Sequence, residues 1–139
     1  NLIYREDERE MLPLCRDLGV GVIPFSPIAR GVLARKPEQN MTDSIRYKVD
    51  DLATSRYEQE DNLTTIRRVV EVAEKHGIPM AQVALAWILS KPGIAAPIIG
   101  ATKPHHLDDA IASLEVKLSD EEIKYLEEPY RPHPIIAHT

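Results

Sequence analysis

Two short turns hold the residues of this 139-residue chain that are best suited to binding chemistry. The first runs from Phe25 to Gly31 (Phe-Ser-Pro-Ile-Ala-Arg-Gly), and the second runs from Gly100 to Pro104. Each turn follows an apolar run and opens a loop or helix whose first backbone N–H groups lack local partners. Because such N–H groups and the helix dipole both favour an anion, the two turns predict phosphate binding.

The apolar runs before the turns, residues 20–25 and 96–99, are predicted to be buried parallel β-strands. Both lack polar alternation, which is typical of strands covered on two faces. Strands that alternate with helices imply right-handed crossovers and a parallel sheet, whose strands end on the same side. One ligand with a pyrophosphate group could therefore contact both turns.

Helical periodicity predicts the remaining elements. Gly19 and Gly77 are expected to end two helices, Pro79 to open a well-buried one, and Ser119 with Glu122 to form a capping box for the last. The expected core faces of two helices consist of evenly spaced apolar residues. They are Met11, Leu14, Cys15 and Leu18 in the first helix, and Leu107, Ile111 and Leu114 in the helix after Pro104.

Composition excludes several classes of function. The net charge of -5 and the few aromatic residues argue against nucleic-acid binding, and no apolar run approaches the roughly 20 residues of a membrane span. The single Cys15 cannot form an internal disulfide, which fits a reducing, cytoplasmic setting. The neighbouring His105 and His106 point about 100° apart on a helix, so we expect no metal site.

The chain is expected to be part of a larger molecule. Asn1 is not a methionine, and Leu2 to Tyr4 resembles the end of an element whose beginning is absent. Two parallel strands cannot form an independent sheet, because both faces and both edges need cover. We therefore expect the C-terminal part of a larger α/β barrel or sheet, unless the chain assembles as a homo-oligomer.

Four runs, in order along essentially the whole chain, resemble the C-terminal portion of an aldo-keto reductase. They are Asn1–Glu6, Val22–Leu33, Gln82–Trp87 and Pro97–Thr102, and the similarity is greatest to the bacterial branch related to potassium-channel β-subunits. The resemblance implies an α/β fold in which residues 1–139 form the last two βα units and the C-terminal helix of a (β/α)8 TIM barrel. It also implies a mobile cofactor loop at 26–61 and an extended tail at 129–139.

The resemblance further implies that the chain binds part of NADP(H). Phe25 would stack on the nicotinamide, and the turn after it would lie along the pyrophosphate. Basic residues would close over the cofactor, and the second turn would hold the adenosine 2′-phosphate. Beyond Phe25, the implied residues are Ser26, Pro27, Ile28 and Gly31 for the pyrophosphate, Lys36 and Arg46 in the closing loop, Gly100, Thr102 and Lys103 for the 2′-phosphate, and His106 and Asp109 toward the adenine. Ala110 departs from the family's usual Asn.

The implied activity is NADP(H)-dependent reduction of a small aldehyde or ketone by hydride transfer. The family's catalytic Asp, Tyr, Lys and His lie on earlier strands, so no catalytic residue maps onto this chain, and the 139 residues alone are expected to be inactive. Two alternatives stay open. One is a cofactor-binding regulatory module without turnover, and the other is a truncated piece with no function of its own.

Overall fold

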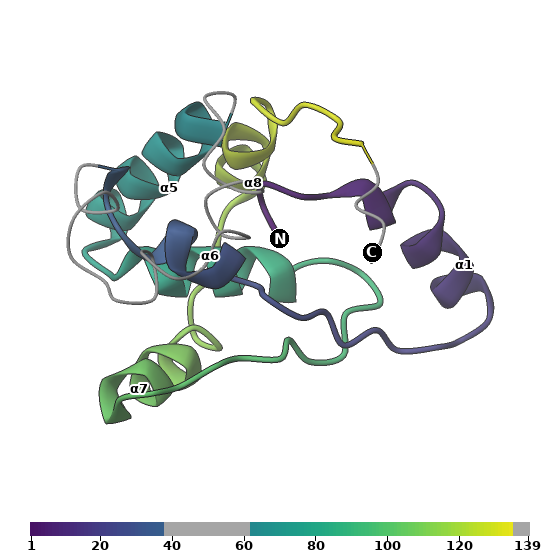
Figure 1. Ribbon diagram of the computed structural model, residues 1–139, viewed down its shortest axis with the longest axis horizontal. Helices are drawn as coiled ribbons and strands as arrows, with labels where there is room; N and C mark the ends of the chain where they lie inside the picture. The colour runs from purple at the N-terminus through teal and green to yellow at the C-terminus, as the bar shows by residue number, and fades with distance from the viewer. Residues whose placement is uncertain (38–61, 135–139) are drawn as a thin grey trace.

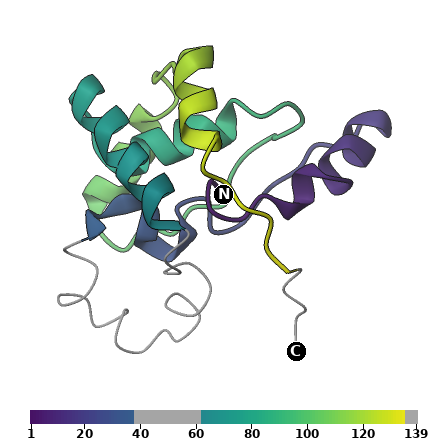
Figure 2. The same cartoon turned by 90° about the horizontal axis from the view of Figure 1, so that it is seen from above.

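The computed structural model describes residues 1–37 and 62–134, which form helices joined by extended segments. In Figure 1, α5, α6 and α8 lie together, while α1 and α7 lie toward opposite edges; Figure 2 shows α1 extending away from the other helices. The 3₁₀ helices are named η. The bounds are η1 (Glu6–Glu8), α1 (Met11–Asp17), η2 (Ala29–Ala34), α5 (Leu63–His76), α6 (Met80–Leu89), α7 (Pro104–Ala112) and α8 (Asp120–Glu127).

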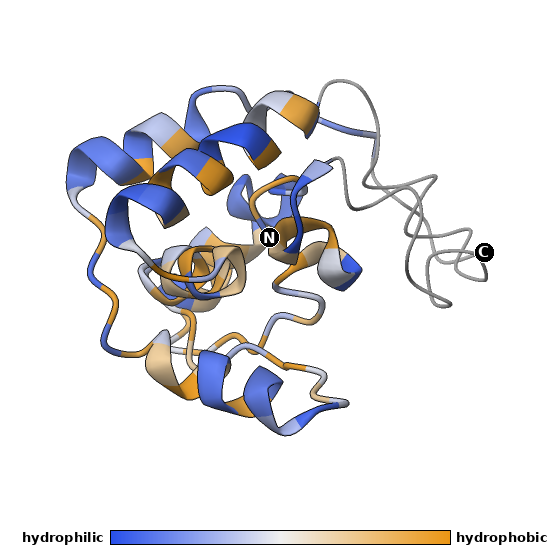
Figure 3. Cartoon of the chain, turned by 90° about the vertical axis from the view of Figure 1, so that its left-hand side faces the viewer, coloured by the Kyte–Doolittle hydropathy of each residue, from blue (hydrophilic) through white to orange (hydrophobic). Residues whose placement is uncertain are grey.

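Helix α6 lies at the centre of the core, as its sequence predicts. It is apolar nearly all round, and such a helix is stable only when neighbours cover every side. Figure 3 shows it in the middle of the molecule with more polar helices around it. Its Trp87 is only 2% exposed and belongs to one hydrophobic cluster with Leu2, Leu33, Ile66 and Leu126.

The predicted ends of α5 and α8 are confirmed. Helix α5 ends at Gly77, whose φ of 66° lies in the left-handed region that closes many helices. Helix α8 begins with the capping box: Ser119 Oγ accepts from the Glu122 N–H at 3.2 Å, and Glu122 Oε2 accepts from the Ser119 N–H at 3.0 Å. Local chemistry therefore fixes both boundaries.

Glu122 also joins α8 to the end of α5. Its Oε1 accepts hydrogen bonds from Lys75 Nζ at 2.7 Å and from His76 Nε2 at 2.9 Å. The hydrogen bond from Lys75, with further contributions from the Ser119 N–H and His76, lowers the pKa of Glu122 to about 2. A carboxyl group whose pKa is lower in the folded state stabilises that state when it is ionised.

We expect Glu122→Gln to lower the free energy of unfolding by about 1–2 kcal/mol at pH 7. The pKa of this carboxyl is depressed on folding, so its contribution is complete above the unfolded value near 4.5 and is lost as the pH falls toward 2. Urea unfolding at a series of pH values should show the two proteins converging in stability below pH 4. Glu115→Gln, at an exposed position, is the matched control; an equal loss there would contradict the assignment.

The two predicted strands are only partly formed. Residues 20–25 and 94–98 are joined by two isolated parallel bridges, Val22 with Ile94 and Phe25 with Ile98, and the described residues contain no longer strand. The parallel direction matches the prediction, but the predicted burial is wrong: Phe25 is 63% and Ile98 52% exposed. The physical reason is that the described residues supply neither further strands nor a layer over these side chains.

The predicted core faces of α1 and α7 are also wrong for the described part of the chain. Large apolar side chains on both helices are more than half exposed, and Cys15, expected in the core, is only half-buried. Helix α1 packs mainly against the short η1. The exposed apolar residues of the two predicted faces are Met11, Leu14, Leu18, Ile111 and Leu114, and Leu107 is half exposed.

The residues after α8 return to the beginning of the chain. Glu6 Oε1 accepts hydrogen bonds from Tyr130 Oη at 2.6 Å and from the His133 N–H at 2.9 Å, and these contacts lower the pKa of Glu6. Residues 130–134 have no regular secondary structure, and residues 135–139 of the predicted tail lie outside the described residues. Within the described ranges, no helix is both long and apolar enough to cross a membrane.

Candidate functional site

The two phosphate-type turns begin side by side. The Ala95 N–H donates to Val22 O at 2.8 Å, and the Ile98 N–H donates to Pro24 O at 2.8 Å. In Figure 1 both segments run in the same direction, one toward η2 and the other toward α7. The turns that follow Phe25 and Ile99 therefore lie at the same end of the paired segments, as the sequence predicts.

Phe25 stands at the start of the first turn with its ring largely uncovered. Its backbone is bridged to Ile98, which fixes the position from which the ring projects. An exposed ring at the end of a paired segment can bind a flat, partly apolar ligand.

The first turn has an uncommon backbone. Ser26, Ala29 and Arg30 have φ values of 50°, 49° and 57°, and Gly31 has a φ of 103°. Left-handed residues within short turns occur in the concave backbone nests that bind anions. The turn is tied down by the Ala29 N–H, which donates to Ser26 O at 2.9 Å, and by the burial of Ala29.

We expect Gly31→Ala to lower the free energy of unfolding by about 1–2 kcal/mol, because an L-residue with a side chain is strained at this φ. No atom lies within 4 Å of an added Cβ at Gly31, so the cost would come from the backbone alone. Gly100→Ala is the matched control, since its Cβ would also meet open space and its φ is not left-handed. Equal urea midpoints for the two variants would contradict this explanation.

The loop predicted over residues 26–61 is partly folded in its described portion. Residues 29–34 form η2, and its Val32 and Leu33 are buried in the core. Lys36 Nζ contacts Glu74 Oε1 of α5 at 2.6 Å, which directs this charge toward α5. Arg46 and the rest of the loop, residues 38–61, lie outside the described residues.

The second turn presents exposed residues at the start of α7. Gly100, Thr102 and Lys103 are exposed, and Lys103 occupies the N-cap position before Pro104. His106 accepts through Nδ1 from the Thr102 N–H at 3.3 Å. The helix start and the cation lie together here, which suits a phosphate group.

Asp109 is held from a neighbouring helix. Its Oδ1 accepts from Gln82 Nε2 of the central α6 at 3.0 Å, so α7 has a fixed contact with the core. His105 and His106 make an edge-to-face contact with ring centroids 4.5 Å apart. No three His, Cys, Asp or Glu side chains lie together as metal ligands in the part of the chain that the structure describes.

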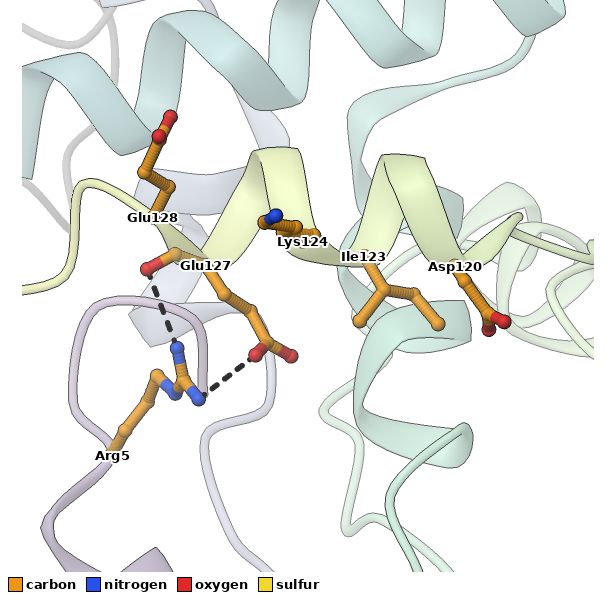
Figure 4. A pocket seen from close by; sticks show the side chains of 6 residues that line it. All are labelled: Arg5, Asp120, Ile123, Lys124, Glu127 and Glu128. Atoms are coloured by element: carbon orange, nitrogen blue, oxygen red, sulfur yellow. Dashed lines mark hydrogen bonds and ion pairs between the residues drawn. The ribbon is translucent and has the colours of Figure 1, made fainter.

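A separate pocket of about 410 Å³ lies against α8 and contains none of the predicted site residues. Figure 4 shows it lined by Arg5, Asp120, Ile123, Lys124, Glu127 and Glu128. Arg5 is committed to its neighbours, because Nη2 contacts Glu8 at 2.7 Å and Glu127 at 3.1 Å. This ion-pair network joins the beginning of the chain to α8 and is best explained as structural.

Two of the described tyrosines donate hydrogen bonds to carboxylates away from the turns. Burial, and then the hydrogen bond to Glu6, raises the pKa of Tyr130. The hydrogen bond from Tyr125 to Glu71 raises the pKa of Tyr125. Both shifts make these two hydroxyl groups weaker proton donors. Tyr47 and Tyr57 lie outside the described residues.

One residue at the site was missed by the sequence reasoning. Asn1 Nδ2 donates to the carbonyl oxygen of Ser26 at 3.1 Å, across 25 positions in the chain. No periodicity or spacing links these positions, so only the tertiary structure identifies the contact.

Comparisons with known proteins agree with the resemblance found in the sequence. The model of the aldo/keto reductase family matches residues 1–131. Versiconal hemiacetal acetate reductase of Aspergillus parasiticus is 49% identical over 137 residues, which are 97% of this chain and 39% of that protein. Aldo-keto reductases of Fusarium vanettenii and Metarhizium robertsii are each 45% identical over 141 residues, which cover 100% of this chain and 37% of each protein. The chain thus spans less than two fifths of the length of these fungal relatives.

Proposed function

The chain belongs to the aldo/keto reductase family, and from that premise we propose that the protein is an NADP(H)-dependent oxidoreductase of aldehydes or ketones. The single observation that carries this proposal is the pairing of Phe25 with Ile98. This pairing brings an exposed aromatic ring, a left-handed turn and the start of a cation-bearing helix to one end of two parallel segments. NADP(H) has a nicotinamide ring, a pyrophosphate and an adenosine 2′-phosphate, and the aromatic ring, the turn and the helix start could contact them in that order.

The described residues fit the two ends of NADP(H). The ring of Phe25 would contact the nicotinamide, and the turn containing Ser26, Pro27, Ile28 and Gly31 would hold the pyrophosphate. Gly100, Thr102 and Lys103 would hold the 2′-phosphate, with His106 and Asp109 toward the adenine. Lys36 and Arg46 are proposed as basic residues that close over the cofactor. For Lys36, this requires release of the exposed ion pair with Glu74.

In the proposed reaction the nicotinamide supplies the hydride that reduces the carbonyl carbon. The residues of this chain bind and orient: Phe25 fixes the plane of the ring, and the two turns hold the charged groups that set its position. We propose, from the resemblance to the family, that the catalytic acid and most of the pocket that selects a small carbonyl substrate lie on earlier strands of the barrel.

The exposed apolar faces support a place within a larger barrel. We propose that residues 1–139 contribute the last two βα units and the C-terminal helix of a (β/α)8 barrel. The apolar residues of α1, α7 and the bridged segments, apart from Phe25, would then pack against the remaining strands and helices. We also propose that the protein is cytoplasmic and has no nucleic-acid or membrane partner, which agrees with its acidic composition.

Two measurements on the complete protein test this function. Calorimetry should show tight binding of NADPH and much weaker binding of NADH, because only NADPH carries the 2′-phosphate. A panel of aldehydes and ketones should then give NADPH oxidation, followed by absorbance. Binding without oxidation of NADPH by any carbonyl compound would favour a regulatory module, and no binding of either nucleotide would overturn the proposal.

A further inference from the structure

The turn after Phe25 has a conformation that its residues do not favour by themselves. Ser26 has a φ of 50°, although a serine side chain makes the left-handed region unfavourable compared with glycine. Ala29 and Arg30 share this feature within four residues. Strained residues persist only where surrounding contacts hold them, so something must stabilise the first of them.

Asn1 supplies a contact of this kind from outside the turn. Its Nδ2 donates to Ser26 O at 3.1 Å, and that carbonyl also accepts from the Ala29 N–H at 2.9 Å. The carbonyl of the left-handed residue is therefore fixed by one donor within the turn and one from a distant segment.

The amide of Asn1 is itself held in place. Its Oδ1 accepts from the Ile3 N–H at 3.2 Å, and its backbone oxygen accepts from the Tyr4 N–H at 3.1 Å. Leu2 and Ile3, which follow it, are fully buried in the core. The side chain that carries the donor is therefore held by local hydrogen bonds and by a buried neighbouring backbone.

We propose that Asn1 is a positioning residue for the nicotinamide cofactor. Its hydrogen bond holds the Ser26–Gly31 turn in the conformation that binds the pyrophosphate. This inference rests on the proposed function. Without the hydrogen bond, Ser26 can relax toward negative φ, and the backbone of the turn would lose the left-handed form seen at Ser26, Ala29 and Arg30. Cofactor binding would then have to order the turn, and the free energy needed for this ordering would lower the affinity for the cofactor.

The test compares two ligands that differ in their contact with the turn. NADPH contains the pyrophosphate, whereas 2′-AMP carries only the adenosine and the 2′-phosphate held by the second turn. Asn1→Asp keeps the shape and the acceptor for the Ile3 N–H but removes the donor to Ser26 O. Asn1→Ala removes the donor without adding a charge, so agreement between the two variants separates a lost hydrogen bond from charge repulsion.

We expect calorimetry on the complete protein to show about a tenfold higher Kd for NADPH in both variants, with the Kd for 2′-AMP changed by less than about twofold. Ser90→Ala is the matched control, because it removes another hydrogen bond from a side chain to a carbonyl, the 2.7 Å contact to Trp87 O at the end of α6. That variant should bind both ligands normally.

Three other outcomes are distinguishable. An unchanged Kd for NADPH in both Asn1 variants would overturn the positioning role and leave the proposed function intact. Equal weakening of NADPH and 2′-AMP, with a lowered Tm, would assign Asn1 a general structural role and overturn the inference. If the unsubstituted protein bound neither ligand, the proposed function would fail and the inference would fail with it.

Discussion

Lys103→Glu is expected to raise the Kd for NADPH about a hundredfold, or about 2.7 kcal/mol, while the Kd for NADH changes by less than about threefold. Lys103 is exposed at the N-cap position of α7, where the helix dipole and the cation would both attract the proposed 2′-phosphate. Reversing the charge replaces an attraction to the 2′-phosphate dianion with a repulsion. NADH lacks that phosphate, so its affinity reports whether the rest of the site is intact.

Lys124→Glu is the matched control for this charge reversal. Lys124 is exposed on α8, and the same change there alters the net charge of the protein equally. Fluorescence titration should show near-normal NADPH affinity for this variant. If both variants weakened NADPH to the same extent, a long-range charge effect would explain the result and Lys103 would lose its assigned role.

Trp87→Ala is expected to lower the free energy of unfolding by about 3–5 kcal/mol, the range typical of removing a large aromatic side chain from a core. Trp87 is almost fully buried in the central helix, and its Nε1–H donates to Glu127 Oε1 at 2.9 Å. The Arg5 guanidinium lies 5.6 Å and the Lys91 ammonium 4.8 Å from the ring centroid. The substitution would therefore leave a cavity in the core. It would also remove the hydrogen bond that Trp87 donates to Glu127 in the ion-pair network on α8.

Trp87→Phe separates these two contributions. Phenylalanine retains an aromatic ring for packing and for the neighbouring cations but has no N–H donor. Glu127 keeps its contacts with Lys91 and Arg5, so we expect a loss of about 1–2 kcal/mol in urea unfolding. A loss as large as that of Trp87→Ala would show that the hydrogen bond, rather than packing, dominates at this position.

The helix boundaries could be predicted from the sequence because short-range chemistry sets them. The Ser119 and Glu122 capping pair and the left-handed Gly77 depend only on residues a few positions away. The central position of α6 could also be predicted, since a helix that is apolar all round has no face suited to water. These features do not depend on the rest of the molecule.

The burial of α1, α7 and the paired segments could not be predicted in the same way. An apolar face specifies that a neighbour is needed but not where in the polypeptide that neighbour lies. Met11 and Leu114 have the spacing of core residues, yet the described residues leave more than half of each side chain exposed. The two parallel bridges stay isolated for the same reason, because strands gain stability when further strands pair with their free edges.

The two turns of the candidate site could be predicted from the sequence, but the tertiary contacts that hold them could not. The turns after residues 25 and 99 could be found from glycine, proline and aromatic residues, and the structure brings them to one end. The contact from Asn1 to Ser26, the tie between Gln82 and Asp109, and the ion pair of Lys36 with Glu74 join distant segments. Such contacts depend on the three-dimensional arrangement and leave no local pattern.

A crystal structure of the complete protein with NADPH bound tests the proposed cofactor site directly. We expect the nicotinamide against the ring of Phe25, the pyrophosphate along the Ser26–Gly31 turn, and the 2′-phosphate within hydrogen-bond distance of Thr102 or Lys103. A cofactor bound with its phosphates away from both turns would contradict this expectation.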